Sequence, residues 1–133
     1  MTRWLVLAVT AGLLVVAPAS AREPTLRTAA SAQRHVVVTF APGDLTPMQV
    51  AVATSRAHTA SGAFLPANVK LHERISAAPD PATGLVRFET RGTLPRGVYY
   101  VAVSGAVQDP TPSCIPIRSR CGERWSNVLR IVV

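Results

Sequence analysis

Few side chains in this sequence have the types and the spacing that metal binding requires. The three histidines, His35, His58 and His72, fall in separate segments of the chain. The one carboxylate beside a histidine is Glu73, and because neighbouring residues of a strand point to opposite faces, Glu73 and His72 would point apart. We therefore expect neither a metal site nor a cofactor.

The carboxylates give equally little support for catalysis. Asp44, Asp80 and Asp109 each stand next to a proline or a glycine, where turn formation explains them. Glu73 and Glu89 could approach each other across strands, but no pattern places them in one cleft as paired-carboxylate hydrolysis requires. The sequence also lacks the motifs of serine hydrolases, phosphate-binding loops and zinc proteases. We expect a protein that is not an enzyme.

The segments that carry these residues follow a predicted signal peptide, residues 1–21. Arg3 gives a basic start, residues 4–17 are apolar, and Ala19-Ser20-Ala21 is a small-x-small cleavage pattern. The apolar run is shorter than the roughly 20 residues that a membrane-spanning helix needs. We expect cleavage after Ala21, with Ala19 as the alternative site, no transmembrane anchor, and a product that is secreted or associated with the cell surface.

Export bears on the two cysteines, Cys114 and Cys121. Six residues separate them and no histidine is adjacent, so they do not supply the four ligands of a structural zinc site. In an oxidising compartment such a pair usually forms a disulfide bond. We expect a Cys114–Cys121 disulfide.

The predicted disulfide lies in the longest connection, residues 105–124. Long loops in compact domains are often functional. A speculative binding site here would present three guanidinium groups and one aromatic plane to an anionic or sugar ligand: Arg118, Arg120, Arg124 and Trp125. The alternative is that the disulfide only holds a long loop, the arginines are solvated, and Trp125 covers the end of the core.

Composition limits the partners of a secreted chain. With 133 residues, 48% of them hydrophobic, there is room for one core and no second catalytic domain. The formal charge is +7. Outside a cell, the acidic partners for such a protein are anionic envelope polymers, acidic polysaccharide or anionic lipid, and not nucleic acid.

The hydrophobic pattern of the mature chain has a period of two, which is typical of half-buried strands. Residues 22–34 read as a linker or a first strand, and residues 35–133 as the domain. In the segment from residue 69, alternation predicts that Val69 and Leu71 face inward. Six short segments punctuated by Gly and Pro predict an antiparallel sandwich: 35–40, 48–52, 69–75, 86–89, 98–104 and 127–133.

Two segments carry a resemblance to known domains. Residues 94–103 (LPRGVYYVAV) resemble the turn into the sixth strand of immunoglobulin-like and fibronectin type III-like sandwiches, and residues 125–133 (WSNVLRIVV) look like their last strand. The mature chain is also similar to small, uncharacterised secreted proteins of GC-rich bacteria. The resemblance implies an antiparallel sandwich of about seven strands and a secreted address, but no activity. The tryptophan and the inter-sheet disulfide typical of antibody domains are missing, which disfavours that type.

The resemblance gives the tyrosine pair a structural role. A tyrosine just inside the corner can bury its ring while its hydroxyl bonds a backbone group. We assign this role to Tyr99, which shares a face with Val101 and Val103; Tyr100 lies on the other face.

These observations predict a secreted, noncatalytic structural or binding module. Its partner would be an anionic envelope polymer, a polysaccharide or another extracellular protein. The alternative is a small extracellular hydrolase or metal-handling protein with a site assembled from distant residues. Clustering of the three histidines, or of Glu73 and Glu89, would favour that alternative.

Overall fold

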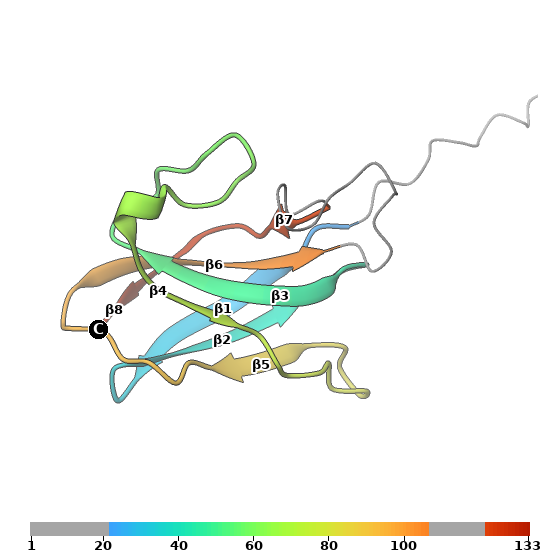
Figure 1. Ribbon diagram of the computed structural model, residues 1–133. Helices are drawn as coiled ribbons and strands as arrows, with labels where there is room; N and C mark the ends of the chain where they lie inside the picture. The colour runs from blue at the N-terminus through green and yellow to red at the C-terminus, as the bar shows by residue number, and fades with distance from the viewer. Residues whose placement is uncertain (1–21, 107–121) are drawn as a thin grey trace, which may run out of the picture.

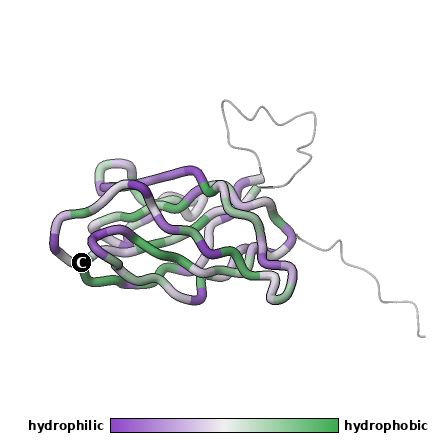
Figure 2. The backbone as a smooth tube through the Cα atoms, turned by 90° about the horizontal axis from the view of Figure 1, so that it is seen from below, coloured by the Kyte–Doolittle hydropathy of each residue, from purple (hydrophilic) through white to green (hydrophobic). Residues whose placement is uncertain are grey.

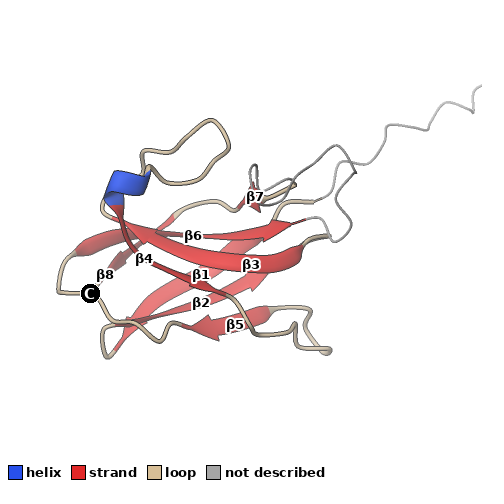
Figure 3. Ribbon diagram, viewed as in Figure 1, coloured by secondary structure: helices blue, strands red, loops and turns tan. Residues whose placement is uncertain are grey.

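The computed structural model describes residues 22–106 and 122–133, which fold into two antiparallel sheets (Figure 1). Within these residues there is no α-helix, and the single helical turn is the 3-10 segment η2 (Figure 3). The all-β antiparallel sandwich predicted from the period of two is confirmed. The elements are β1 (Thr25–Ala32), β2 (His35–Ala41), β3 (Thr46–Ala53), η2 (Pro66–Asn68), β4 (Val69–Arg74), β5 (Val86–Glu89), β6 (Val98–Ala106), β7 (Arg124–Trp125) and β8 (Leu129–Val132).

The strand order divides the chain into two layers. The first sheet has the order β1-β2-β5, so segment 22–34 contributes a strand to it. The second sheet has the order β4-β3-β6, with β7 and β8 pairing successive parts of β6. None of the described helical segments is long and apolar enough to cross a bilayer.

The core between the sheets follows from alternation along the strands. Every second residue of β2 and of β6 points inward. Hydrophobic and hydrophilic stretches alternate along the backbone tube in Figure 2. Removing one such side chain from water contributes roughly 1.5–3 kcal/mol. The apolar side chains of this interior that are almost fully buried are Val36, Val38, Phe40, Val50, Val52, Val86, Leu94, Val101 and Val103.

The β1–β2 hairpin turns on Gln33 and Arg34, both with positive φ (53° and 70°). Ala32 pairs with His35, so the loop has two residues, and positive φ at both is the mark of a type I′ turn. Such backbone conformations cost side chains other than glycine about 1 kcal/mol or more. Arg34 is held there by Leu94, whose carbonyl accepts from Nε at 2.9 Å and whose N–H donates to the Arg34 carbonyl at 3.0 Å.

The prediction that Val69 faces inward is wrong. The pairs Val52↔Leu71 and Ala53↔Val69 leave Lys70 as an extra residue on β4. This bulge shifts the alternation, since two residues of one strand then oppose one of its partner. Val69 therefore packs on the outer face of the second sheet, beside Ala53.

The two adjacent tyrosines of β6 lie on opposite faces. The Tyr99 side chain is buried, and its hydroxyl donates to the Pro95 carbonyl at 2.8 Å, the backbone contact assigned to it above. Tyr100 points to the outer face, where the Arg56 guanidinium lies 4.9 Å from the centre of its ring.

The side chain of Asn127 joins the first sheet to the segment that precedes β8. The Asn127 amide lies beside β1, where Leu26 N–H donates to Oδ1 at 2.8 Å and Nδ2 donates to the Leu26 carbonyl at 3.0 Å. This pair of bonds connects the first sheet to the segment between β7 and β8.

Candidate functional site

The structure keeps the histidines apart. His35 is on β2 of the first sheet, with Nδ1 2.9 Å from the Thr90 carbonyl oxygen. His58 is exposed in the connection between β3 and β4, and His72 is exposed on β4. Among residues 22–106 and 122–133, no three His, Cys, Asp or Glu side chains are grouped so that they could hold a metal ion.

Glu73 and Glu89 do not share a cleft. Glu89 pairs with Val37 on the solvent face of the first sheet. Glu73 instead accepts the backbone N–H groups of Arg91 and Gly92, each at 2.7 Å. Its carboxylate thus connects β4 of the second sheet to the segment that follows β5 of the first.

Gly92 lies close to two side chains where this carboxylate docks. A Cβ on Gly92 would lie 2.8 Å from Leu71 Cδ1 and 3.1 Å from Glu73 Oε2, so a larger residue here would displace the ends of these two side chains. The sequence placed Glu73 among catalytic candidates, whereas its contacts give it a structural role.

The speculative loop site falls only partly within the described residues. Arg118, Arg120, Cys114 and Cys121 lie outside them. Arg124 is exposed on β7, but the Trp125 side chain is only 8% exposed and packs against other apolar groups. Trp125 therefore covers apolar residues and does not offer an open aromatic plane, and the residues it covers lie on the outer face of the second sheet.

A second apolar cluster occupies that outer face. It consists of small residues on the strands, Ala51, Ala53 and Ala102, with Phe64 and Trp125 against them, and we call it the outer cluster. The alanines alternate with inward-facing valines on β3 and β6. Because the alanine side chain is short, it leaves space between the outer face of this sheet and the segments that pack over it.

The outer loop, residues 54–68, covers part of this surface. Its tip is a narrow hairpin in which Thr59 N–H donates to the Ala63 carbonyl at 2.7 Å and Gly62 N–H to the Thr59 carbonyl at 2.9 Å. Gly62 has φ 94°, and a Cβ on it would lie 3.4 Å from Trp125 Cβ. The glycine lets the hairpin lie directly on the tryptophan, so the loop has a defined position.

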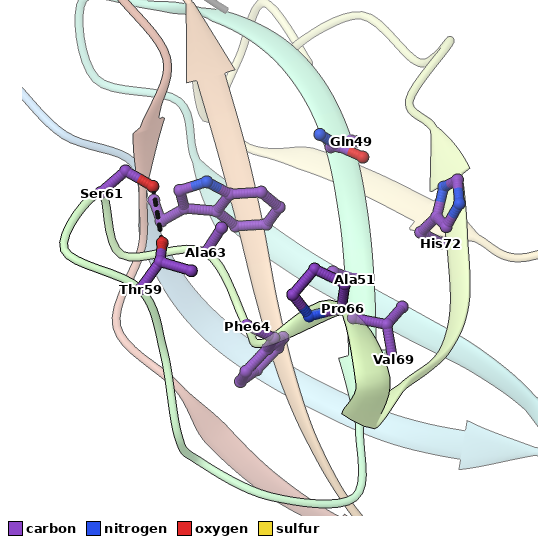
Figure 4. A pocket seen from close by; sticks show the side chains of 10 residues that line it. Gln49, Ala51, Thr59, Ser61, Ala63, Phe64, Pro66, Val69 and His72 are labelled. Carbon is purple, nitrogen blue, oxygen red and sulfur yellow. Dashed lines mark hydrogen bonds between the residues drawn. The ribbon is translucent and has the colours of Figure 1, made fainter. Parts of the chain in front are cut away.

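A pocket of about 480 Å³ lies between the outer loop and strands β3 and β4. Figure 4 shows Thr59 and Ser61 on the loop side, with their hydroxyls 2.8 Å apart in a hydrogen bond, and His72 on the opposite side. The lining residues are Gln49, Ala51, Thr59, Ser61, Ala63, Phe64, Pro66, Val69, His72 and Trp125.

Gln49 is oriented by a hydrogen-bond network. Its Nε2 donates to Glu123 Oε2 at 2.9 Å, and the Ser104 hydroxyl donates to the same oxygen at 2.9 Å. With Nε2 committed to Glu123, the amide carbonyl oxygen of Gln49 points the other way. The pocket thus has a positioned acceptor at one end.

Basic side chains stand around the pocket but do not line it. Arg74 is opposite Gln49 on β4, and Lys70 is exposed on the same strand. Arg56 of the outer loop and Arg130 of β8 lie beside Tyr100. This face therefore attracts anions at its margin, while none of the described lining residues is an arginine, lysine, aspartate or glutamate.

Sequence reasoning missed the pocket residues Gln49, Thr59 and Ser61. They belong to separate segments and match no motif, because what unites them is the path of the outer loop. One signal was available: alanines alternate with valines in residues 50–53, and small residues on the outer face of a central strand mark a surface that something else covers.

Comparison with known proteins adds no family assignment. No protein-family model matches this chain, and a search of curated proteins finds no match. What can be said of its function follows from the fold and from the pocket.

Proposed function

We propose that this protein is an exported, noncatalytic binding module of fibronectin type III-like fold that recognises its partner through the outer face of the second sheet. The observation that carries the proposal is the pocket beneath the outer loop, which has an ordered rim and a floor of small apolar residues. Preformed concave sites with a few placed polar groups are where proteins usually bind small ligands.

The strand order supports the fibronectin type III-like assignment. In constant-type immunoglobulin domains the fourth strand joins the sheet of the first, second and fifth strands. Here β4 pairs with β3 in the other sheet, through pairs such as Val50↔Glu73. The Tyr99 hydroxyl bond to Pro95 is the corner contact of such sandwiches.

The positions of the catalytic candidates favour binding over catalysis. Glu73 and Tyr99 are engaged with backbone groups, and the three histidines lie on different elements: His35 on β2, His58 in the outer loop and His72 on β4. A general base needs a position within hydrogen-bond reach of a reacting group, and these contacts are used for structure. Export through the 1–21 segment and the Cys114–Cys121 disulfide are parts of the same proposal.

The experiment compares one substitution on the two outer faces. Ala51→Leu adds a larger side chain to the pocket floor, while Ala30→Leu makes the same change on the exposed face of β1. The secreted protein and both variants are tested by sedimentation with isolated envelope polysaccharide and anionic wall polymer. We expect binding that Ala51→Leu reduces at least about tenfold and Ala30→Leu leaves unchanged.

Equal binding by both variants would remove the pocket as the recognition site. Turnover of a hydrolysable substrate by the purified protein would overturn the noncatalytic assignment.

A further inference from the structure

We propose that the pocket binds a short saccharide, an inference that rests on the proposed binding function and specifies its ligand class. At about 480 Å³, the pocket is within the usual size range of small-molecule sites. It is partly open to solvent, so a unit of a longer polymer could enter without the chain ends being enclosed.

The polar groups of the walls match a polyhydroxylated ligand. Thr59 and Ser61 hydroxyls and the His72 imidazole can each donate and accept hydrogen bonds, and the Gln49 carbonyl oxygen accepts. Thr59 and Ser61 share one hydrogen bond, so whichever hydroxyl accepts in it keeps its own proton for a ligand. Sugar hydroxyls are likewise donors and acceptors at once, and they would meet such groups on facing walls.

The apolar floor of the pocket suits the C–H groups on the face of a sugar ring. Ala51, Ala63 and Val69, with the nearby edge of Trp125, form an apolar surface between the polar walls. Sugar rings present C–H groups on their faces, and burying these against apolar side chains is favourable. A phosphate or a free carboxylate has no such surface and would need a fixed cation, whereas Lys70 and Arg74 lie outside the lining.

Trp125 provides a direct readout. The chain has two tryptophans, Trp4 and Trp125, and Trp4 lies in the 1–21 segment proposed to be removed on export, so the tryptophan fluorescence of the secreted protein comes from Trp125 alone. This protein is titrated with neutral glucose and N-acetylglucosamine oligosaccharides and, in a separate arm, with oligogalacturonate. We expect a saturable change in fluorescence in at least one arm.

Two matched variants locate the site. Thr59→Ala with Ser61→Ala removes the two rim hydroxyls, and Thr28→Ala with Thr39→Ala removes a cross-strand pair of hydroxyls from the outer face of the first sheet. The rim variant should bind about tenfold more weakly, since two hydrogen bonds to the ligand are lost. The control variant should bind as the parent does, and both should unfold at the same urea concentration within error.

The remaining outcomes separate this inference from the proposed function. No fluorescence change in either arm, with polymer binding still sensitive to Ala51→Leu, would overturn the saccharide and keep the binding module. If neither oligosaccharide arm changes the fluorescence and the polymers do not bind either, both the saccharide inference and the proposed binding function are overturned. A third outcome is that only oligogalacturonate binds, that salt abolishes this binding, and that the rim variant binds as tightly as the parent. This result would assign recognition to the basic margin and overturn the pocket site.

Discussion

The interior of the sandwich and the outer cluster are two apolar regions built on the same strand. Val50 and Val52 of β3 point between the sheets and are fully buried, whereas Ala51 and Ala53 point to the outer face. The interior is filled from both sides by branched and aromatic side chains. The outer cluster is covered from one side by a loop, and a pocket remains beside it. One strand thus stabilises the fold with one face and shapes a binding surface with the other.

The difference has an energetic meaning. Truncating a side chain between the two sheets leaves a cavity that the backbone cannot close. Truncating one beneath a loop leaves a smaller cavity, because the loop can move onto the shorter side chain. Stability should therefore depend mainly on the interior, and recognition on the outer face. Three pairs of substitutions test this division.

Phe40 and Phe64 give the largest contrast, because the same residue type is buried in each region. Phe40→Ala should lower the free energy of unfolding by about 3–5 kcal/mol, and Phe64→Ala by about 1–3 kcal/mol because the outer loop can collapse. Urea denaturation of the two variants measures both values. Equal losses would break the comparison by showing that the outer cluster is as rigid as the interior.

Within β4, Glu73 contributes to stability by joining the two sheets, whereas its neighbour His72 lines the pocket. Glu73→Gln leaves one acceptor oxygen for two backbone N–H groups, and should lower the free energy of unfolding by about 1–3 kcal/mol. Glu89→Gln, on the solvent face, is the control and should stay within about 0.5 kcal/mol of the parent. A Glu73 variant as stable as the control would mean that its two contacts add nothing to the joining of the sheets.

The two tyrosines of β6 give the smallest and most local contrast. Tyr99→Phe removes the hydroxyl that donates to Pro95 and should cost about 1 kcal/mol. Tyr100→Phe keeps the ring under Arg56 and should change stability by less than about 0.5 kcal/mol. Thermal unfolding of both variants decides the matter, and a reversed order would exchange the roles of the two tyrosines.

Sequence reasoning succeeded where one face of a strand is fully buried. Alternation in residues 35–40 and 98–104 predicts most of β2 and β6, and it places Tyr99 and Tyr100 on opposite faces. A period of two is a strong signal there because a shift by one residue would exchange the valines with the polar side chains.

It failed where tertiary contacts override local preference. Gln33 and Arg34 lack the Asn-Gly signal of a type I′ turn, and a contact with Leu94, sixty residues away, helps to hold Arg34 there. The bulge at Lys70 has no signature in the sequence, and it moved Val69 to the outer face. The pocket was not predictable either, because Thr59, Ser61 and His72 meet only after the outer loop has folded over β3.

Asn127 has a consequence for how copies of this chain meet. The backbone N–H and C=O of an edge strand are the groups that another strand would use to extend the sheet, and proteins must block them to avoid aggregation. At Leu26 both groups already bond to the Asn127 amide, which takes the place of a neighbouring strand. A side chain of the same molecule thereby closes β1 at this point to strand addition by a second copy.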